Sequence, residues 1–189
     1  MDIQVLMDIC LEEGAARAAV IEVAQIPFDK GLRAYCAANA CGSYGKNWAC
    51  PPGVGEPDEV IARARQYRYA LVFQAVGQME DSFDFEGMEA AGRRFGETAE
   101  RIRSRVADQI PGYLLLTAGG CSVCPVCAKV EDKPCRFPDK AISSLEAYCM
   151  QVSRLAAACG MPYHNGPNTV TNFLSLIHIS EPTRLLSIS

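Results

Sequence analysis

The sequence predicts an α/β fold: one domain in which a mixed sheet is flanked by helices, with two cysteine-rich metal-binding loops. Three observations support this prediction. Segments with strand character alternate along the chain with segments of helical periodicity. With 189 residues, 49% hydrophobic and 21% charged, the chain has the size and composition of a globular domain with one core. Seven of its ten cysteines are crowded into two segments rich in turn residues.

The first 28 residues predict a helix followed by a strand. Leu6, Ile9 and Cys10 recur on one helical face, and Gly14 is a typical helix stop. Residues 18–28, AAVIEVAQIPF, are β-branched and almost entirely apolar, which is typical of a buried strand. The acidic residue at position 2 and the absence of a basic segment argue against a secretory signal.

A long connection, a helix and a second strand come next. Residues 29–55 are punctuated by Gly, Asn, Ser and Pro, and a loop of this length in a compact domain is normally functional or held by something. A helix is expected from Pro57 to about Gln66, because Pro is favoured at the first helical position. Residues 69–77, YALVFQAVG, predict the second strand.

Residues 85–110 have the clearest helical periodicity, with Glu89–Arg93 and Glu97–Arg101 as predicted pairs on the solvent face. The sequence GYLLLTA at 112–118 predicts a third strand that runs into the second cysteine segment. A helix over about 143–158 and a strand over 168–173 complete the predicted domain, residues 1–173.

The tail, residues 174–189, breaks from the preceding pattern. LSLIHISEPTRLLSIS resembles translated sequencing-adapter read-through, so we interpret it as a non-native tail and leave it outside the fold. We therefore expect that deleting it leaves metal content and solubility unchanged.

Composition limits the classes of partner and the compartment. The net charge of −4 gives no general attraction to nucleic acid or anionic lipid, and no apolar run approaches the roughly 20 residues of a membrane span. We expect a cytoplasmic protein that has neither a nucleic-acid nor a membrane partner. Its cysteines should then be mostly reduced. Cys10, Cys149 and Cys159 lie in helical patterns and are interpreted as small buried hydrophobes.

The second cysteine segment carries the strongest functional signal. Its spacing is C-x2-C-x2-C-x7-C, followed by Arg136 and Pro138, and its thiols are those of Cys121, Cys124, Cys127 and Cys135. Three thiols at three-residue spacing, a fourth farther along and a nearby proline are typical of iron–sulfur ligands, although the last spacing is longer than in bacterial ferredoxins. A single zinc ion favours two separated pairs of ligands, and a redox thiol loop needs only two cysteines. Both of these remain alternatives.

The first cysteine segment, YCAANACGSYGKNWACPPGVG, is less specific. Cys36, Cys41 and Cys50 are its candidate metal ligands, and glycines and prolines give it the character of a ligand loop. The SYGKN stretch lacks the phosphate-loop pattern. Each cysteine loop follows a predicted strand, and loops after parallel neighbouring strands share one edge of a sheet, so we expect the two loops to meet.

Three motifs in order carry a family resemblance: CGSYGKNWACPP, the C-x2-C-x2-C-x7-C-R-x-P block and PDKAISSLEAY. Over roughly residues 15–173 the chain resembles the uncharacterised predicted metal-binding protein family, domain of unknown function 2284. The resemblance implies metal binding by both loops, in a family found largely among anaerobes, and no particular reaction. The family often has EACG where this chain has Glu146-Ala147-Tyr148-Cys149, so no ligand role is carried onto Cys149. Its closing strand is here replaced by the tail.

The leading functional hypothesis is a protein that carries an iron–sulfur cluster, of the 4Fe-4S type, for redox or electron-transfer chemistry with a redox partner protein. The alternatives are a zinc-stabilised interaction module without catalysis, or an enzyme that uses an open metal site. No Ser/His/Asp set or nucleotide fingerprint indicates a hydrolase or dehydrogenase. Lys46 and Arg136, next to the loops, are candidates for offsetting the charge of a cluster.

Seven loop thiols do not fill two four-thiolate sites. One arrangement is a complete site on the second loop and a three-thiolate site on the first, whose open position accepts water, an Asp or His164. The other is a single site shared by both loops. Spacing does not decide between them.

Overall fold

The computed structural model describes residues 3–107, 110 and 112–178. A five-stranded sheet lies at its centre, in the order β1-β2-β5-β3-β4. The strands are β1 (Arg17–Glu22), β2 (Tyr69–Gln78), β3 (Tyr113–Thr117), β4 (Ser143–Ser144) and β5 (Thr169–His178). All neighbouring pairs are antiparallel except β3 and β4, which are parallel. The predicted α/β class with a mixed sheet is confirmed.

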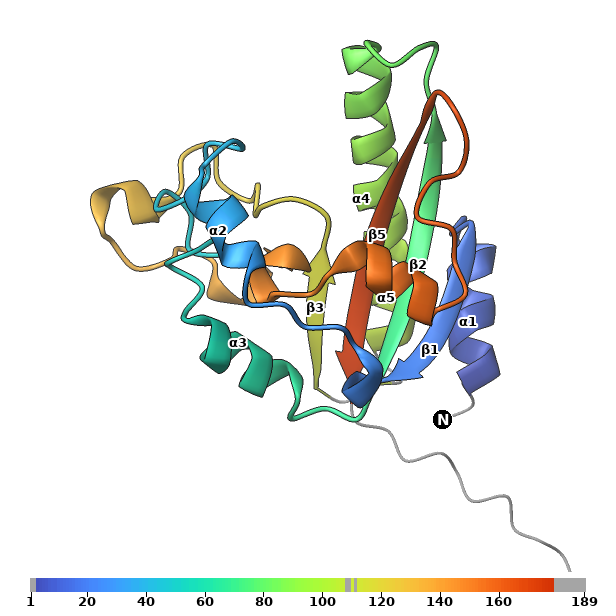
Figure 1. Ribbon diagram of the computed structural model, residues 1–189, viewed down its shortest axis with the longest axis horizontal. Coiled ribbons are helices and arrows are strands. Elements are labelled where there is room, and N and C mark those ends of the chain that lie inside the picture. The colour runs from blue at the N-terminus through green and yellow to red at the C-terminus, as the bar shows by residue number, and fades with distance from the viewer. Residues whose placement is uncertain (1–2, 108–109, 111, 179–189) are drawn as a thin grey trace, which may run out of the picture.

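Helices cover both faces of the sheet (Figure 1). One face carries α1 (Ile3–Glu12) and α4 (Phe85–Ala107), and the other carries α3 (Pro57–Ala64) and α5 (Val152–Ala158). A short helix, α2 (Leu32–Ala37), lies apart from the sheet. The described residues also include four short 3₁₀ segments: η1 (Val23–Gln25), η2 (Ala128–Glu131), η3 (Pro138–Lys140) and η4 (Glu146–Tyr148).

Two apolar cores arise because the side chains of a strand alternate between its faces. On β2, Leu71 and Phe73 pack with α1 and α4, whereas Ala70 and Val72 pack with the segments of the opposite face. This burial on both sides explains why the sequence of β2 is a continuous apolar run. None of the described helices is long and apolar enough to cross a membrane.

Several predicted elements are confirmed. Helix α1 ends before Gly14, which adopts a φ of +100°, and buries the apolar face that its sequence predicts. Helix α3 begins at Pro57 as expected. The Glu89–Arg93 ion pair is present, at 3.3 Å. The pairing predicted between Glu97 and Arg101 is wrong, because Arg101 instead reaches Glu13, the residue after α1, 3.0 Å away.

The predicted helix over 143–158 is wrong in its first half. Ser143 and Ser144 pair with β3, and Cys149 adopts a left-handed φ of 61°, which interrupts helical geometry. The true helix, α5, begins only at Val152, and the Gln151 side chain caps it by accepting from the backbone N–H of Arg154. The first strand is also shorter and less buried than predicted, since β1 lies at the edge of the sheet.

The predicted end of the domain at residue 173 requires correction. Strand β5 continues to His178 and pairs with β2 and β3 on its two sides. Leu174, Leu176 and Ile177 are buried, because this strand supplies apolar side chains to both cores. Excluding residues 174–178 from the fold was therefore wrong. Residues 179–189, the rest of the predicted tail, lie outside the described residues, and the adapter origin of the tail stays a prediction.

Candidate metal centre

The two cysteine segments lie together in a lobe beside the β3–β4 end of the sheet (Figure 1). Hydrogen bonds join them directly. The Asn47 side-chain amide donates to the backbone carbonyl of Cys121 at 2.8 Å. The Trp48 indole N–H donates to the backbone carbonyl of Lys133 at 2.9 Å. The expectation that the fold brings the two loops together agrees with these contacts.

The route by which they meet differs from the expected one. Strands β1 and β3 are neither neighbours nor parallel, because β2 and β5 lie between them and β3 runs against β1. Instead, the chain after β1 is hydrogen-bonded to the turn that precedes α5. The N–H of Asp29 donates to the carbonyl of Cys149 at 2.7 Å, and the carbonyl of Pro27 accepts from the N–H of Gln151 at 3.0 Å. These two bonds hold the segment just before α2, which then continues into the lobe.

The first loop is folded by its own turn residues. Gly42 and Gly45 adopt left-handed φ values of 74° and 71°, a conformation that costs glycine little. The N–H of Gly45 donates to the carbonyl of Pro51 at 2.9 Å, which closes the loop on itself. Cys36 on α2 and Cys41 and Cys50 in the loop lie around one common space.

That space is a cavity of about 430 Å³, which we call the upstream cavity. Cys36, Cys41 and Cys50 line it, together with Glu146 and with Gly119 and Gly120 at the start of the second loop. Of the described residues, no Lys or Arg lines it. A cavity between two chain segments that is rich in thiols and free of basic side chains suits a cationic or metal-containing occupant.

Burial dominates the electrostatics of these thiols. It raises the pKa of Cys50 to about 11, and the neighbouring thiols of Cys41, Cys36, Cys121 and Cys127 add to the rise in that order. Cys50 therefore lies within electrostatic reach of thiols from both loops. Burial also raises the pKa of Cys36, and the positive charge of Arg33 opposes that rise.

Gly120 permits the close approach of the two loops. A Cβ atom at this position would stand 3.2 Å from the sulfur of Cys50, nearer than ordinary van der Waals contact. The absence of a side chain here leaves the Cys50 sulfur room beside the start of the second loop.

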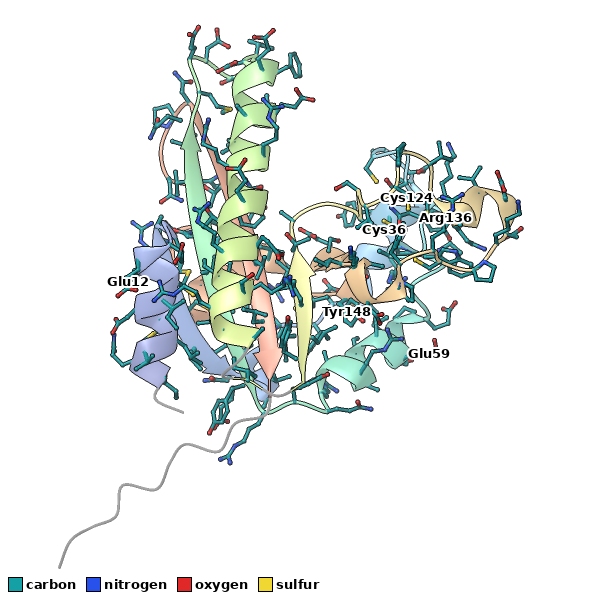
Figure 2. The ribbon with its side chains drawn as sticks, turned by 180° about the vertical axis from the view of Figure 1, so that it is seen from behind. Glu12, Cys36, Glu59, Cys124, Arg136 and Tyr148 are labelled. Atoms are coloured by element: carbon teal, nitrogen blue, oxygen red, sulfur yellow. The ribbon has the colours of Figure 1, made fainter. Side chains whose placement is uncertain are left out.

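The second loop is closed by Arg136, whose guanidinium donates to the carbonyl of Val126 at 2.9 Å. This bond returns the chain that follows Cys135 to the stretch between Cys124 and Cys127. Figure 2 shows Cys36, Cys124 and Arg136 gathered in one lobe, although they come from segments far apart in the sequence. Arg136 thus has a structural role in the loop. Lys46, the other predicted counter-charge, is exposed.

Several predicted candidates lie away from the lobe. The ring of His164 contacts that of Tyr163, at 4.8 Å between centroids, and Tyr163 stacks on Phe173 of β5. His164 is therefore placed near the sheet and not with the thiols. Cys10, on α1, is buried in the core that α1 and α4 share. Cys159 packs against the core on the other face of the sheet. Their interpretation as packing residues agrees with this placement.

Within the described part of the chain, no group of three His, Cys, Asp or Glu side chains is already placed to hold a single metal ion. The sequence pattern missed three residues that shape the site, namely Arg33, Asn47 and Glu146. No cysteine-type spacing marks them, because each acts across a contact that only the fold creates. Glu146 does lie in the PDKAISSLEAY motif, which was the available signal.

Comparisons with known proteins give one positive finding. A family model described as "Predicted metal-binding protein (DUF2284)" matches residues 19–179, which includes both cysteine loops and all of β5. Neither a curated protein nor a solved structure matches the chain.

Proposed function

We propose, from the premise that this chain belongs to the DUF2284 family of predicted metal-binding proteins, that it carries an iron–sulfur cluster used in redox or electron-transfer chemistry. The family membership supports metal binding as such. The observation that carries the finer proposal is the convergence of thiols from two loops on one lobe, with Cys50 in electrostatic reach of both sets.

The donor chemistry fits such a group. Iron–sulfur clusters are held by cysteine thiolates, and the two loops of this lobe provide seven cysteines. The upstream cavity has a volume of about 430 Å³, which is room for more than a single ion. A zinc ion takes four ligands, so the seven loop cysteines exceed what one zinc site uses. This surplus supports a polynuclear occupant.

When bound, an iron–sulfur cluster accepts and returns electrons at a potential set by its surroundings. The chain contributes the remaining functions. Cys121, Cys124, Cys127 and Cys135 form the set whose spacing best suits one cluster, and the Arg136–Val126 bond closes the loop around them. Arg33 places a positive charge beside Cys36, which offsets thiolate charge at the upstream site.

Anaerobic purification followed by iron and acid-labile sulfide determination tests the proposal. The expected result is a brown protein whose visible absorption is bleached by dithionite, with iron and sulfide in similar amounts. A colourless protein that contains stoichiometric zinc and no sulfide would overturn it in favour of the zinc-stabilised module.

A further inference from the structure

We infer that Glu146 is the fourth ligand of a metal site formed with Cys36, Cys41 and Cys50, separate from the four-thiolate site of the second loop. This inference rests on the proposed function and names a ligand for it. It also accounts for the odd number of loop thiols: four belong to one site, and three are completed by a carboxylate.

The argument begins with the upstream cavity. Its lining includes four residues of the types that commonly ligate metals: Cys36, Cys41 and Cys50 of the first loop, and Glu146. The other cysteine of that region, Cys149, belongs to the apolar core and has no exposed surface. Glu146 is exposed and opens onto the same space as the three thiols, so it and not Cys149 is the available fourth donor.

Hydrogen bonds within the protein hold the turn that carries Glu146 in place. The N–H of Leu145 donates to the carbonyl of Thr117 at the end of β3, at 3.1 Å. The Ser144 hydroxyl accepts from the N–H of Ala147 at 3.0 Å. A ligand held on a turn that is tied to the sheet is positioned more precisely than one on a free loop. No three such side chains among the described residues are already placed around one point, so the first loop, which carries the thiols, is the part that closes around the metal on binding.

Charge favours the same assignment. When the three thiols lose their protons to a bound metal, three thiolates and a carboxylate give four negative charges around a cavity that no described Lys or Arg lines. Arg33 is the neighbouring cation whose field acts on Cys36. One positive side chain offsets only part of that charge, so a cation or a metal cluster is required to balance the rest.

The ligand set has a chemical consequence. A carboxylate oxygen is a harder donor than a thiolate, and soft thiolates are the ligands that iron–sulfur clusters and zinc select. The metal position held by Glu146 is therefore the one from which an incoming small molecule displaces a protein ligand most readily. Tyr35 and Tyr44 also line the upstream cavity.

The test isolates the upstream site in the full-length chain. Cys124→Ser and Cys127→Ser together disable the second loop, and iron and sulfide are then reconstituted anaerobically. In this background Glu146→Gln should weaken iron retention at least as much as loss of an outer-shell partner does, about 10- to 100-fold. Glu146→Cys should restore retention and shift the visible and EPR spectra, since it converts the site to four thiolates.

Glu131→Gln is the matched control, because Glu131 is a carboxylate of the same lobe that pairs with Lys133 and does not line the upstream cavity. It should leave iron retention and the spectra unchanged. Equal retention and identical spectra for Glu146→Gln and Glu131→Gln would overturn the inference. Circular dichroism of each variant ensures that a loss of iron is not a loss of fold.

A cobalt(II) titration separates this inference from the proposed function. Thiolate-to-cobalt absorption reports a thiolate site whether or not a cluster assembles. If the unmodified protein holds no iron, the proposed function fails, and the inference then stands or falls on whether Glu146→Gln weakens cobalt binding in the same Cys124→Ser, Cys127→Ser background. Unchanged cobalt affinity and spectrum would refute the role of Glu146.

Discussion

Cys50 shows how one side chain can belong to two loops at once. Its sulfur lies beside the position where Gly120 has no Cβ, and its pKa responds to thiols on both segments. A side chain at position 120 would have to displace this sulfur. The close approach of the Cys50 sulfur to Gly120 joins the two loops into one structural unit.

The cysteines differ in what they should contribute, and Cys124 and Cys159 form a matched pair. Cys124→Ser removes a thiolate from the second loop, so we expect it to lose most of the iron of that loop or to make it oxygen-labile. Cys159→Ser should keep the metal and lower the free energy of unfolding by only about 1 kcal/mol, the ordinary cost of a substitution. Cys159 packs against the core, and burial raises its thiol pKa to about 11.

Iron determination and thermal unfolding of both variants check this prediction. Equal iron loss from Cys124→Ser and Cys159→Ser would contradict it, because metal content would then follow global stability and not the assigned ligands.

The seven loop cysteines could be proposed as ligands from sequence because ligand spacing is a local property of the chain, and their ligand role stays a prediction. Arg33 and Glu146 could not. Glu146 reaches the upstream cavity only because the turn at its position is bound to Thr117 of β3. Such neighbours depend on tertiary contacts, which no spacing in one segment encodes.

At the scale of elements, α4 packs closely against β2 at a point where both elements have small residues. A Cβ at Gly77 of β2 would stand 2.5 Å from the Cβ of Ala91 on α4, so one element would have to shift. Gly77→Ala should therefore destabilise the protein by about 1–3 kcal/mol through overpacking. Gly96, also on α4, faces open space, and Gly96→Ala should stabilise by about 1 kcal/mol through helix propensity. Chemical denaturation measures both, and a stabilising Gly77→Ala would refute this close packing.

The ends of α1 and α4 are joined by charge. Arg105 and Arg101 hydrogen-bond to the Glu13 carboxylate and hold its pKa below its usual range. A depressed folded-state pKa gives stability that is present above the unfolded pKa, about 4.3, and is lost as the pH falls through the folded value. Glu13→Gln should thus lower the melting temperature at neutral pH, and the difference from the unmodified protein should shrink below about pH 4.

Thermal unfolding from pH 7 to pH 3 tests this dependence. The control is Glu89→Gln, which removes an exposed pair within α4 and should have little effect at any pH. A Glu13→Gln difference that stays constant across the range would contradict the ionic link.

Elements with strong local signals were predicted well, as α1, α3 and α4 illustrate. The segment 143–158 was predicted poorly. Its sequence has helical periodicity, but residues 143–144 form a parallel pair with β3 and Cys149 adopts a left-handed conformation. Tertiary hydrogen bonds decide the conformation there, and they override a local preference that is weak.

At the scale of the whole molecule, β5 is the centre of the sheet and the last described element. A chain that ends after Phe173 loses the pairing of residues 174–178 with β2 and β3, along with buried Leu174, Leu176 and Ile177. Fully burying one such side chain contributes about 1.5–3 kcal/mol, so this truncation should abolish cooperative folding. It replaces the expectation, drawn from sequence, that removing residues 174–189 has no effect.

The comparison variant ends after His178 and keeps every described strand pairing. Solubility, circular dichroism and thermal unfolding of the two truncated chains give the result. If the chain ending at Phe173 unfolded with the same midpoint as the chain ending at His178, the central position of β5 would be refuted.

The mixed α/β class followed from alternating patterns, but the strand order did not. Antiparallel placement of β5 between β2 and β3 joins segments about 100 and 60 residues apart, and only the complete set of apolar faces selects it. The lobe likewise gathers two loops that leave opposite ends of the sheet.

Trp48 is the single tryptophan of the chain, and it lies where the two loops meet. Its indole N–H donates to the backbone carbonyl of Lys133, and the Lys129 ammonium lies 4.5 Å from the ring centroid. The protein therefore carries a built-in optical probe of its lobe: ultraviolet-excited emission comes from this junction and from no other tryptophan. A coloured occupant of the lobe would absorb that emission, so the brightness of one indole would report loading and release in real time, without any added label.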